Sequence, residues 1–186
     1  MLGSSILQFP ERSMKMFVSF AVACVTAAAA LPAVAADAQR QADVARRGAD
    51  VMPFNLKATT HIFTKSADGG VQRVVAKNAA DAGQVKLVRE HLREIQMQFL
   101  KGDFSGPTHV HGAQMPGLAK LKAATPGEIA VACQDVDAGA ELVYRTTNPQ
   151  LVAALHEWFD AQLSDHGADA MAGHAHHPEH GAPQSQ

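Results

Sequence analysis

The chain is poor in cysteine, and this scarcity limits the ways in which its fold can be held together. Only Cys24 and Cys133 occur among its 186 residues. Cys24 lies in an N-terminal segment that we expect to be removed, so the remaining chain would keep one cysteine and could not form an internal disulfide. In "EIAVACQ", Cys133 shares a strand face with Ile129 and Val131, which favours a buried structural thiol over a nucleophile. A hydrophobic core must therefore hold the fold.

The sequence also lacks a charge excess and the common catalytic motifs. Lys and Arg number 16 against 18 Asp and Glu, for a formal net charge of −2. This balance gives no indication of binding to nucleic acid or to an anionic membrane surface. No G-x-S-x-G, H-E-x-x-H or phosphate-cradling glycine loop is present. The sequence therefore offers no support for the corresponding hydrolase and nucleotide-binding classes.

The long apolar run that the sequence does have stands near its N-terminus. "MFVSFAVACVTAAAALPAVA" ends in small residues at Ala33 and Ala35, which is the pattern of a secretory signal peptide. We predict that residues 1–35 are this signal, with Met14 as an alternative start and a lipoprotein site at Cys24 as an alternative to cleavage after Ala35. The mature protein is then expected to be periplasmic or secreted, with no stable insertion in a membrane.

Composition divides the rest of the chain into three parts. Residues 36–51 are polar and rich in alanine, which predicts a flexible leader. Residues 52–167 alternate between strand and helix patterns and are long enough for a single α+β domain. Residues 168–186 include "GHAHHPEHGAPQSQ", which lacks apolar periodicity and predicts a disordered histidine-rich tail.

Within the domain, one pattern of two strands and a helix occurs twice. The first hairpin turns at "ADGG", and the following helix is opened by Asp81 and stopped near Gly102. The second hairpin turns at "DAGA", and its helix is opened by Asn148 and Pro149. The sequence predicts an α+β fold of two ββα units, a possible internal duplication. They would form an antiparallel sheet with the helices packed on one face.

The segment "THVHGAQMPG" is the sharpest indication of chemistry. In extended backbone, His109 and His111 would point the same way, and Met115 could add a thioether. Two imidazoles and a soft sulfur suit copper, with zinc as a second possibility, better than Mg²⁺ or Ca²⁺. The alternative is a polar loop in which Met115 packs under one imidazole.

Further histidines could complete such a site. His91 and His156 occupy similar places at the border of each helix's apolar stripe, so either could assist the loop. Asp160 lies one helical turn beyond His156 and is a candidate to orient its ring. The histidine-rich tail could collect metal and raise its concentration near the loop.

These residues predict a periplasmic protein that binds or handles a transition metal, with copper favoured. The expected partners are the metal ion and, as a further candidate, another periplasmic metal-handling protein. Two other classes stay open. One is a small periplasmic enzyme with His109 or His111 as general base, although the sequence shows no evident nucleophile or oxyanion donor. The other is a non-catalytic module that binds a partner. Of these classes, the sequence favours a binding protein over an enzyme.

Three segments carry a resemblance to known proteins. From "HIFTKSADGGVQRVVAK" through "MPGLAKL" to "LVAALHEWFDAQLSDHG", the chain resembles a group of small exported bacterial proteins of unassigned function. Some of these are labelled aspartate carbamoyltransferase, an enzyme family about twice as long whose Ser-Thr-Arg-Thr phosphate loop is absent here. The resemblance implies export and a coherent domain, and it transfers no catalytic residue.

Overall fold

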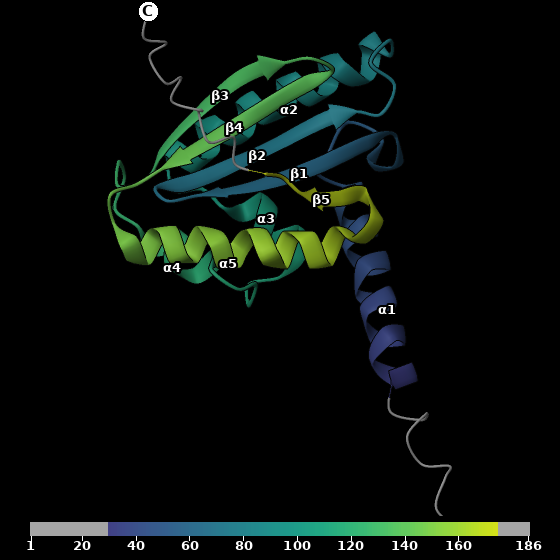
Figure 1. The fold of residues 1–186 in the computed structure, drawn as a ribbon, viewed down its shortest axis with the longest axis horizontal. Coiled ribbons are helices and arrows are strands. Elements are labelled where there is room, and N and C mark those ends of the chain that lie inside the picture. The colour runs from purple at the N-terminus through teal and green to yellow at the C-terminus, as the bar shows by residue number, and fades with distance from the viewer. Residues whose placement is uncertain (1–29, 175–186) are drawn as a thin grey trace, which may run out of the picture.

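Two β-hairpins supply most of a single five-stranded sheet in the computed structural model, which describes residues 30–174 (Figure 1). The hairpins meet where β2 pairs with β4, giving the strand order β3-β4-β2-β1-β5. The strands are β1 (Thr59–Ser66), β2 (Gly69–Ala76), β3 (Ala130–Val136), β4 (Gly139–Arg145) and β5 (Ala170–Ala172). Both hairpins turn where the sequence predicted.

Two long helices follow the hairpins. The helix α2 (Ala82–Leu100) begins at Asp81, whose carboxylate accepts from the main-chain N–H of Gln84 at 3.1 Å. The helix α5 (Pro149–His166) begins at Asn148, whose side chain accepts from the N–H of Gln150 at 3.0 Å. Each cap satisfies an N–H that has no partner within its helix.

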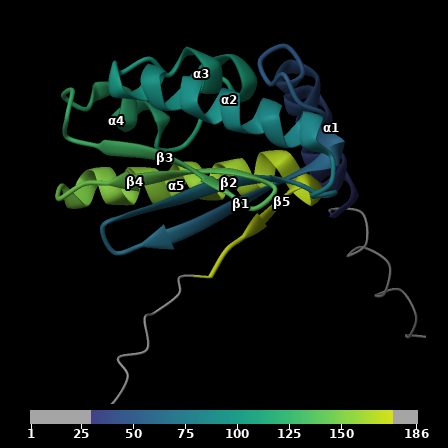
Figure 2. The same ribbon diagram turned by 90° about the horizontal axis from the view of Figure 1, so that it is seen from above.

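Both long helices cover the same face of the sheet. Helix α2 contacts β2, β3 and β4, whereas α5 contacts β1, β2 and β5. Alternate strand residues such as Phe63, Val74 and Leu142 are buried in one core with Leu92 and Phe159 of the two helices. Figure 2 shows α2, α3 and α4 on one side of the strands. The α+β class and the one-sided helical layer are thus confirmed.

The sheet is mixed, and in this it departs from the antiparallel sheet expected. The pairs β1–β2, β2–β4 and β3–β4 are antiparallel, but β5 runs parallel to β1, with His61 opposite Ala170. The 3₁₀ turn η2 (Gly167–Asp169) after α5 brings the chain back to this edge. Residues 168–172, assigned to a disordered tail from the sequence, therefore belong to the fold.

The predicted flexible leader is also different in the structure. Residues Ala30–Gly48 form the helix α1, which contacts α3 and α5 and extends beyond the rest of the domain (Figure 1). Val44 is only 1% exposed, and the guanidinium Nε of Arg47 donates to the carbonyl of Val110 at 2.8 Å. An apolar contact and charged hydrogen bonds hold α1 in place.

Three short helical segments complete the connections, namely η1 (Leu56–Ala58), α3 (Ser105–His111) and α4 (Leu118–Ala123). None of the helices within residues 30–174 is long and apolar enough to span a membrane. Most of the predicted signal peptide and the histidine-rich end from residue 175 lie outside the described residues.

Candidate functional site: a histidine-lined cavity

A cavity of about 330 Å³ lies between the sheet and the helices α2, α3 and α5. Its volume is at the lower end of the range typical of small-molecule sites. Five histidines from four elements line it: His61 on β1, His91 on α2, His109 and His111 on α3, and His166 on α5. Exposed residues of α2 and α3, among them Glu94 and Ser105, stand at its mouth, and buried Trp158 stands deeper.

His111 is held by the strongest polar contacts of the site. Its Nδ1 lies 2.8 Å from Oδ2 of Asp165, and both side chains are almost completely buried. Arg40 of α1 donates to both oxygens of the same carboxylate, at 2.5 and 2.8 Å. No hydrogen bond to Nε2 of His111 is recorded within residues 30–174. Asp165 thus orients the ring and leaves its second nitrogen free.

The charge on Asp165 is favoured by these partners. Burial alone would raise the pKa of its carboxyl, but the hydrogen bonds and charges of His111 and Arg40 outweigh burial and lower that pKa below its ordinary value. The carboxylate is therefore ionised at neutral pH and acts as a fixed acceptor for Nδ1 of His111.

Next to His111, two imidazole rings stack. The rings of His61 and His166 are nearly parallel, with centroids 4.7 Å apart, and His166 meets His111 edge to face at 5.2 Å. Burial lowers the pKa of His61 from 6.5 to about 4 and that of His166 well below its ordinary value. Burial also lowers the pKa of His91. These three rings are consequently uncharged at neutral pH.

Two buried polar atoms on the cavity wall have no hydrogen-bond partner within the described residues. They are Nδ1 of His61 and the indole Nε1 of Trp158, whose residues are 3% and 1% exposed. An unsatisfied buried polar group costs about 1–3 kcal/mol, so native proteins usually give it a protein, water or ligand partner. Trp158 also borders a smaller cavity and His61 a third one, and among the described residues the cavity of about 330 Å³ is the one that both residues line. It is therefore the candidate place for a partner that reaches both.

The structure does not bring the predicted metal loop together. Residues 105–111 are helical, so the side chains of His109 and His111 point to different sides of α3. Pro107 is tolerated because it stands in the first turn, where an N–H has no helical acceptor. His109 is exposed, 3.3 Å from Asp50, whereas Met115 is buried in the hydrophobic core.

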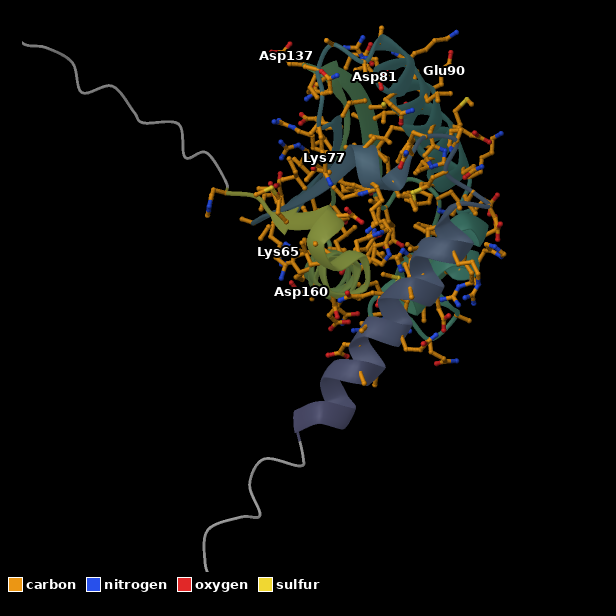
Figure 3. All side chains as sticks on the ribbon, turned by 90° about the vertical axis from the view of Figure 1, so that its right-hand side faces the viewer. Lys65, Lys77, Asp81, Glu90, Asp137 and Asp160 are labelled. Atoms are coloured by element: carbon orange, nitrogen blue, oxygen red, sulfur yellow. The ribbon has the colours of Figure 1, made fainter. Side chains whose placement is uncertain are left out.

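The two assisting histidines have separate surroundings. His91 lines the cavity and meets the ring of Phe54 edge to face, with centroids 5.6 Å apart. His156 lies away from the cavity, and its Nε2 is 2.9 Å from the carbonyl of Gly69 in the first hairpin. Asp160 pairs with Lys65 at 2.6 Å instead of orienting His156, and Figure 3 labels this pair on neighbouring α5 and β1.

No group of three or more His, Cys, Asp or Glu side chains within residues 30–174 has the arrangement needed to hold a metal ion. The rings of His61 and His166, for example, are stacked in parallel. Stacked imidazoles do not direct their nitrogens at one common point, so these two rings cannot both bind one metal ion in this arrangement. The copper and zinc assignments remain untested predictions.

Helix α5 carries a stripe of site residues that lie outside the predicted site. Trp158, Gln162 and His166 are spaced by four residues, which places them along one side of the helix, and all three line the cavity. Gln162 and Asp165 are buried even though they are polar. The sequence signal that could have indicated these residues is Gln162, a polar residue one helical turn after Trp158 on the side of the helix that faces the core.

Comparison of the chain with protein-family models, with curated proteins and with solved structures finds no match in any of the three. The site must therefore be interpreted from its own geometry and chemistry.

Proposed function

We propose that the protein binds a small, largely apolar molecule in the histidine-lined cavity. The observation that carries this proposal is that His61 and Trp158, whose buried atoms Nδ1 and Nε1 have no hydrogen-bond partner among residues 30–174, line one cavity. The apolar lining, which includes Phe54, Leu92 and Phe99, would supply most of the binding free energy by burial.

His111 gives this pocket a capacity for proton transfer. A carboxylate that fixes Nδ1 of an imidazole keeps Nε2 available to exchange a proton with a bound molecule. The pair of His111 and Asp165 supports the general-base alternative for His111, and nothing comparable supports it for exposed His109. The main-chain N–H of Ser105 donates to Asp103 at 2.9 Å, and within residues 30–174 no histidine is hydrogen-bonded to the Ser105 hydroxyl, so the structure shows no histidine that activates it as a nucleophile.

Trp158 provides a direct test of binding. It is the single tryptophan of the chain, so ¹⁵N labelling of tryptophan gives one indole resonance, which reports on the cavity. We expect several uncharged ring compounds from a fragment set, such as phenol, indane and acetophenone, to shift this resonance with saturation. If no fragment does so at millimolar concentration, the proposal fails.

A matched pair of variants locates the binding. Val110 is buried on the cavity wall, and Val110→Phe would fill part of the space. Ala153→Phe adds a similar side chain at an exposed position of α5 away from the cavity. We expect the indole shift to be lost in Val110→Phe and retained in Ala153→Phe. Equal binding by both variants would contradict the assignment to this cavity.

Transition-metal binding is the second candidate function. The observation in its favour is the presence of several imidazoles on one cavity, of which His61, His91 and His166 are kept neutral by burial, the form that coordinates copper or zinc. Coordination would require His61 and His166 to leave their stacked arrangement.

The metal hypothesis is tested on the whole chain with the tail histidines changed to alanine, namely His174, His176, His177 and His180. Calorimetric titration with Cu(I), Cu(II) and Zn²⁺ should then show binding tighter than about micromolar that is lost in His61→Ala and His111→Ala. Binding that disappears with the tail histidines alone would contradict a site within the domain.

A further inference from the structure

The charge distribution of the cavity restricts what it can hold. Among residues 30–174 no arginine or lysine lines it, and the one carboxylate side chain that does so is that of exposed Glu94 at the mouth. A buried anion would thus have no cationic side chain to pair with, and a buried cation would have no inner carboxylate. Because a charge without a partner is costly to bury, the cavity favours an uncharged molecule.

The indole of Trp158 specifies one polar group on that molecule. Its Nε1–H is a donor only, and it has no acceptor within the described residues. Since neighbouring rings such as Phe99 and Tyr144 pack against the indole, with centroids 5.9 Å away in each case, the donor is fixed in direction. An oxygen acceptor on the bound molecule would satisfy it.

The imidazole of His61 specifies a second polar group. Its Nδ1 is buried and has no hydrogen-bond partner among residues 30–174. Burial lowers the pKa of His61 to about 4, so the ring is neutral at pH 7, and Nδ1 donates in one tautomer and accepts in the other. A hydroxyl group, which can both donate and accept, would satisfy Nδ1 in either tautomer.

The remaining wall is apolar and fits a ring. Side chains from four segments contribute to it: Met52 and Phe54, Val74, Leu92 and Ile95, and Val110. A rigid ring buries area against such a wall at little conformational cost, because it has few rotatable bonds to fix.

We infer that the molecule bound in the cavity is an uncharged ring compound with a carbonyl or similar oxygen for Trp158 and a hydroxyl for His61. Hydroxylated aromatic or alicyclic carbonyl compounds have this set of groups. The inference rests on the proposed function and specifies its ligand class.

Matched compounds on one ring test the inference by calorimetry with the whole protein at pH 7. The set is the three hydroxyacetophenone isomers, acetophenone, ethylbenzene and the hydroxybenzoates. We expect the best hydroxyacetophenone to bind about tenfold more tightly than acetophenone, and acetophenone about tenfold more tightly than ethylbenzene, since each loses one hydrogen bond to a buried group. The hydroxybenzoates should bind about a hundredfold more weakly than the corresponding ketones.

A variant assigns the hydroxyl contact to His61. His61→Phe keeps a ring in the stack with His166 and removes Nδ1, so hydroxyacetophenone and acetophenone should bind this variant equally. His156→Gln lies outside the cavity and should keep the wild-type difference. The order of affinities on the wild-type protein already tests the ligand class. The test therefore still works if His61→Phe does not fold.

The outcomes separate the inference from the function on which it rests. Equal affinity for ethylbenzene and hydroxyacetophenone, or tighter binding of the hydroxybenzoates, would overturn the inferred ligand class while leaving a binding cavity in place. The class is likewise overturned if none of these compounds binds but other fragments shift the Trp158 resonance. If no fragment of either set binds, water alone satisfies the two atoms and both proposals fail.

Discussion

At the scale of single residues, buried imidazoles make the fold sensitive to acid. The pKa of His61 is about 4 in the folded protein, against an ordinary value of 6.5, because burial disfavours the charged ring. Between these pH values the unfolded chain binds a proton that the folded chain does not. The contribution of neutral His61 to the unfolding free energy is thus fully present above pH 6.5. It decreases as the pH falls and is lost below about pH 4. His91 and His166 act in the same direction.

The lowered pKa of His61 predicts a measurable part of the loss of stability in acid. The difference between 6.5 and about 4 corresponds to about 3 kcal/mol of unfolding free energy lost between pH 7 and pH 4. In urea denaturation at the two pH values, His61→Phe should lose about 3 kcal/mol less than the wild type. His109→Gln, an exposed control, should behave as the wild type does. Identical pH dependence in His61→Phe and the wild type would refute the assignment.

Asp165 should determine the environment of the His111 ring. Its carboxylate accepts the Nδ1 proton at 2.8 Å inside the fold, which slows exchange of that proton with water. We expect a downfield Nδ1–H signal from His111 in proton NMR that is lost in Asp165→Ala, with a cost of about 2 kcal/mol in stability. Arg40→Gln should retain the signal, because Oδ2 of Asp165 can still accept from Nδ1 of His111 when the half-exposed guanidinium is removed. A signal that survives in Asp165→Ala would show that the carboxylate does not hold the ring.

At the scale of elements, helix α1 supports the site from outside the cavity. Arg40 contacts Asp165, and Arg47 contacts the carbonyl of Val110. Val44, which lies between these two arginines in the sequence, is buried. All three follow the predicted cleavage point after Ala35, so the contacts would persist in a mature protein. The helix connects the N-terminal segment to the residues that orient His111.

The contribution of α1 can be measured by truncating its buried side chain. Val44→Ala should lower the unfolding free energy by about 2 kcal/mol, because it removes two buried methyl groups. Arg46→Ala changes an exposed side chain on the same helix and should alter stability by less than about 0.5 kcal/mol. Urea denaturation compares the two, and no loss of stability in Val44→Ala would indicate the undocked leader expected from the sequence.

Local signals decided which elements could be predicted. Caps such as Asp81 and the Asn148–Pro149 pair, together with the two turns, indicated both ββα units because these signals act within a few residues. Helix α3 was missed because Gly106, Pro107 and Gly112 resemble a loop and its support comes from α1. Strand β5 was missed because three residues paired with a distant strand carry almost no local pattern.

At the scale of the whole molecule, the cavity depends on segments that only tertiary structure brings together. His61, His91, His111 and His166 come from separate elements, so their spacing in the sequence contains no sign of their proximity. The sequence did identify His91 and His111 as candidates, but it joined His111 to His109 and Met115 through a backbone conformation that helix α3 does not have. The buried polar stripe on α5 was the part that sequence reasoning could have found.

In our proposal, the cavity between the sheet and the helices holds a small uncharged molecule. The most direct test is a crystal structure of the protein grown with the tightest-binding hydroxyacetophenone isomer. We expect the compound in the cavity, with its carbonyl oxygen within about 3.2 Å of Nε1 of Trp158 and its hydroxyl at a similar distance from Nδ1 of His61. A structure in which the compound binds elsewhere, while the cavity contains only water, would contradict the claim.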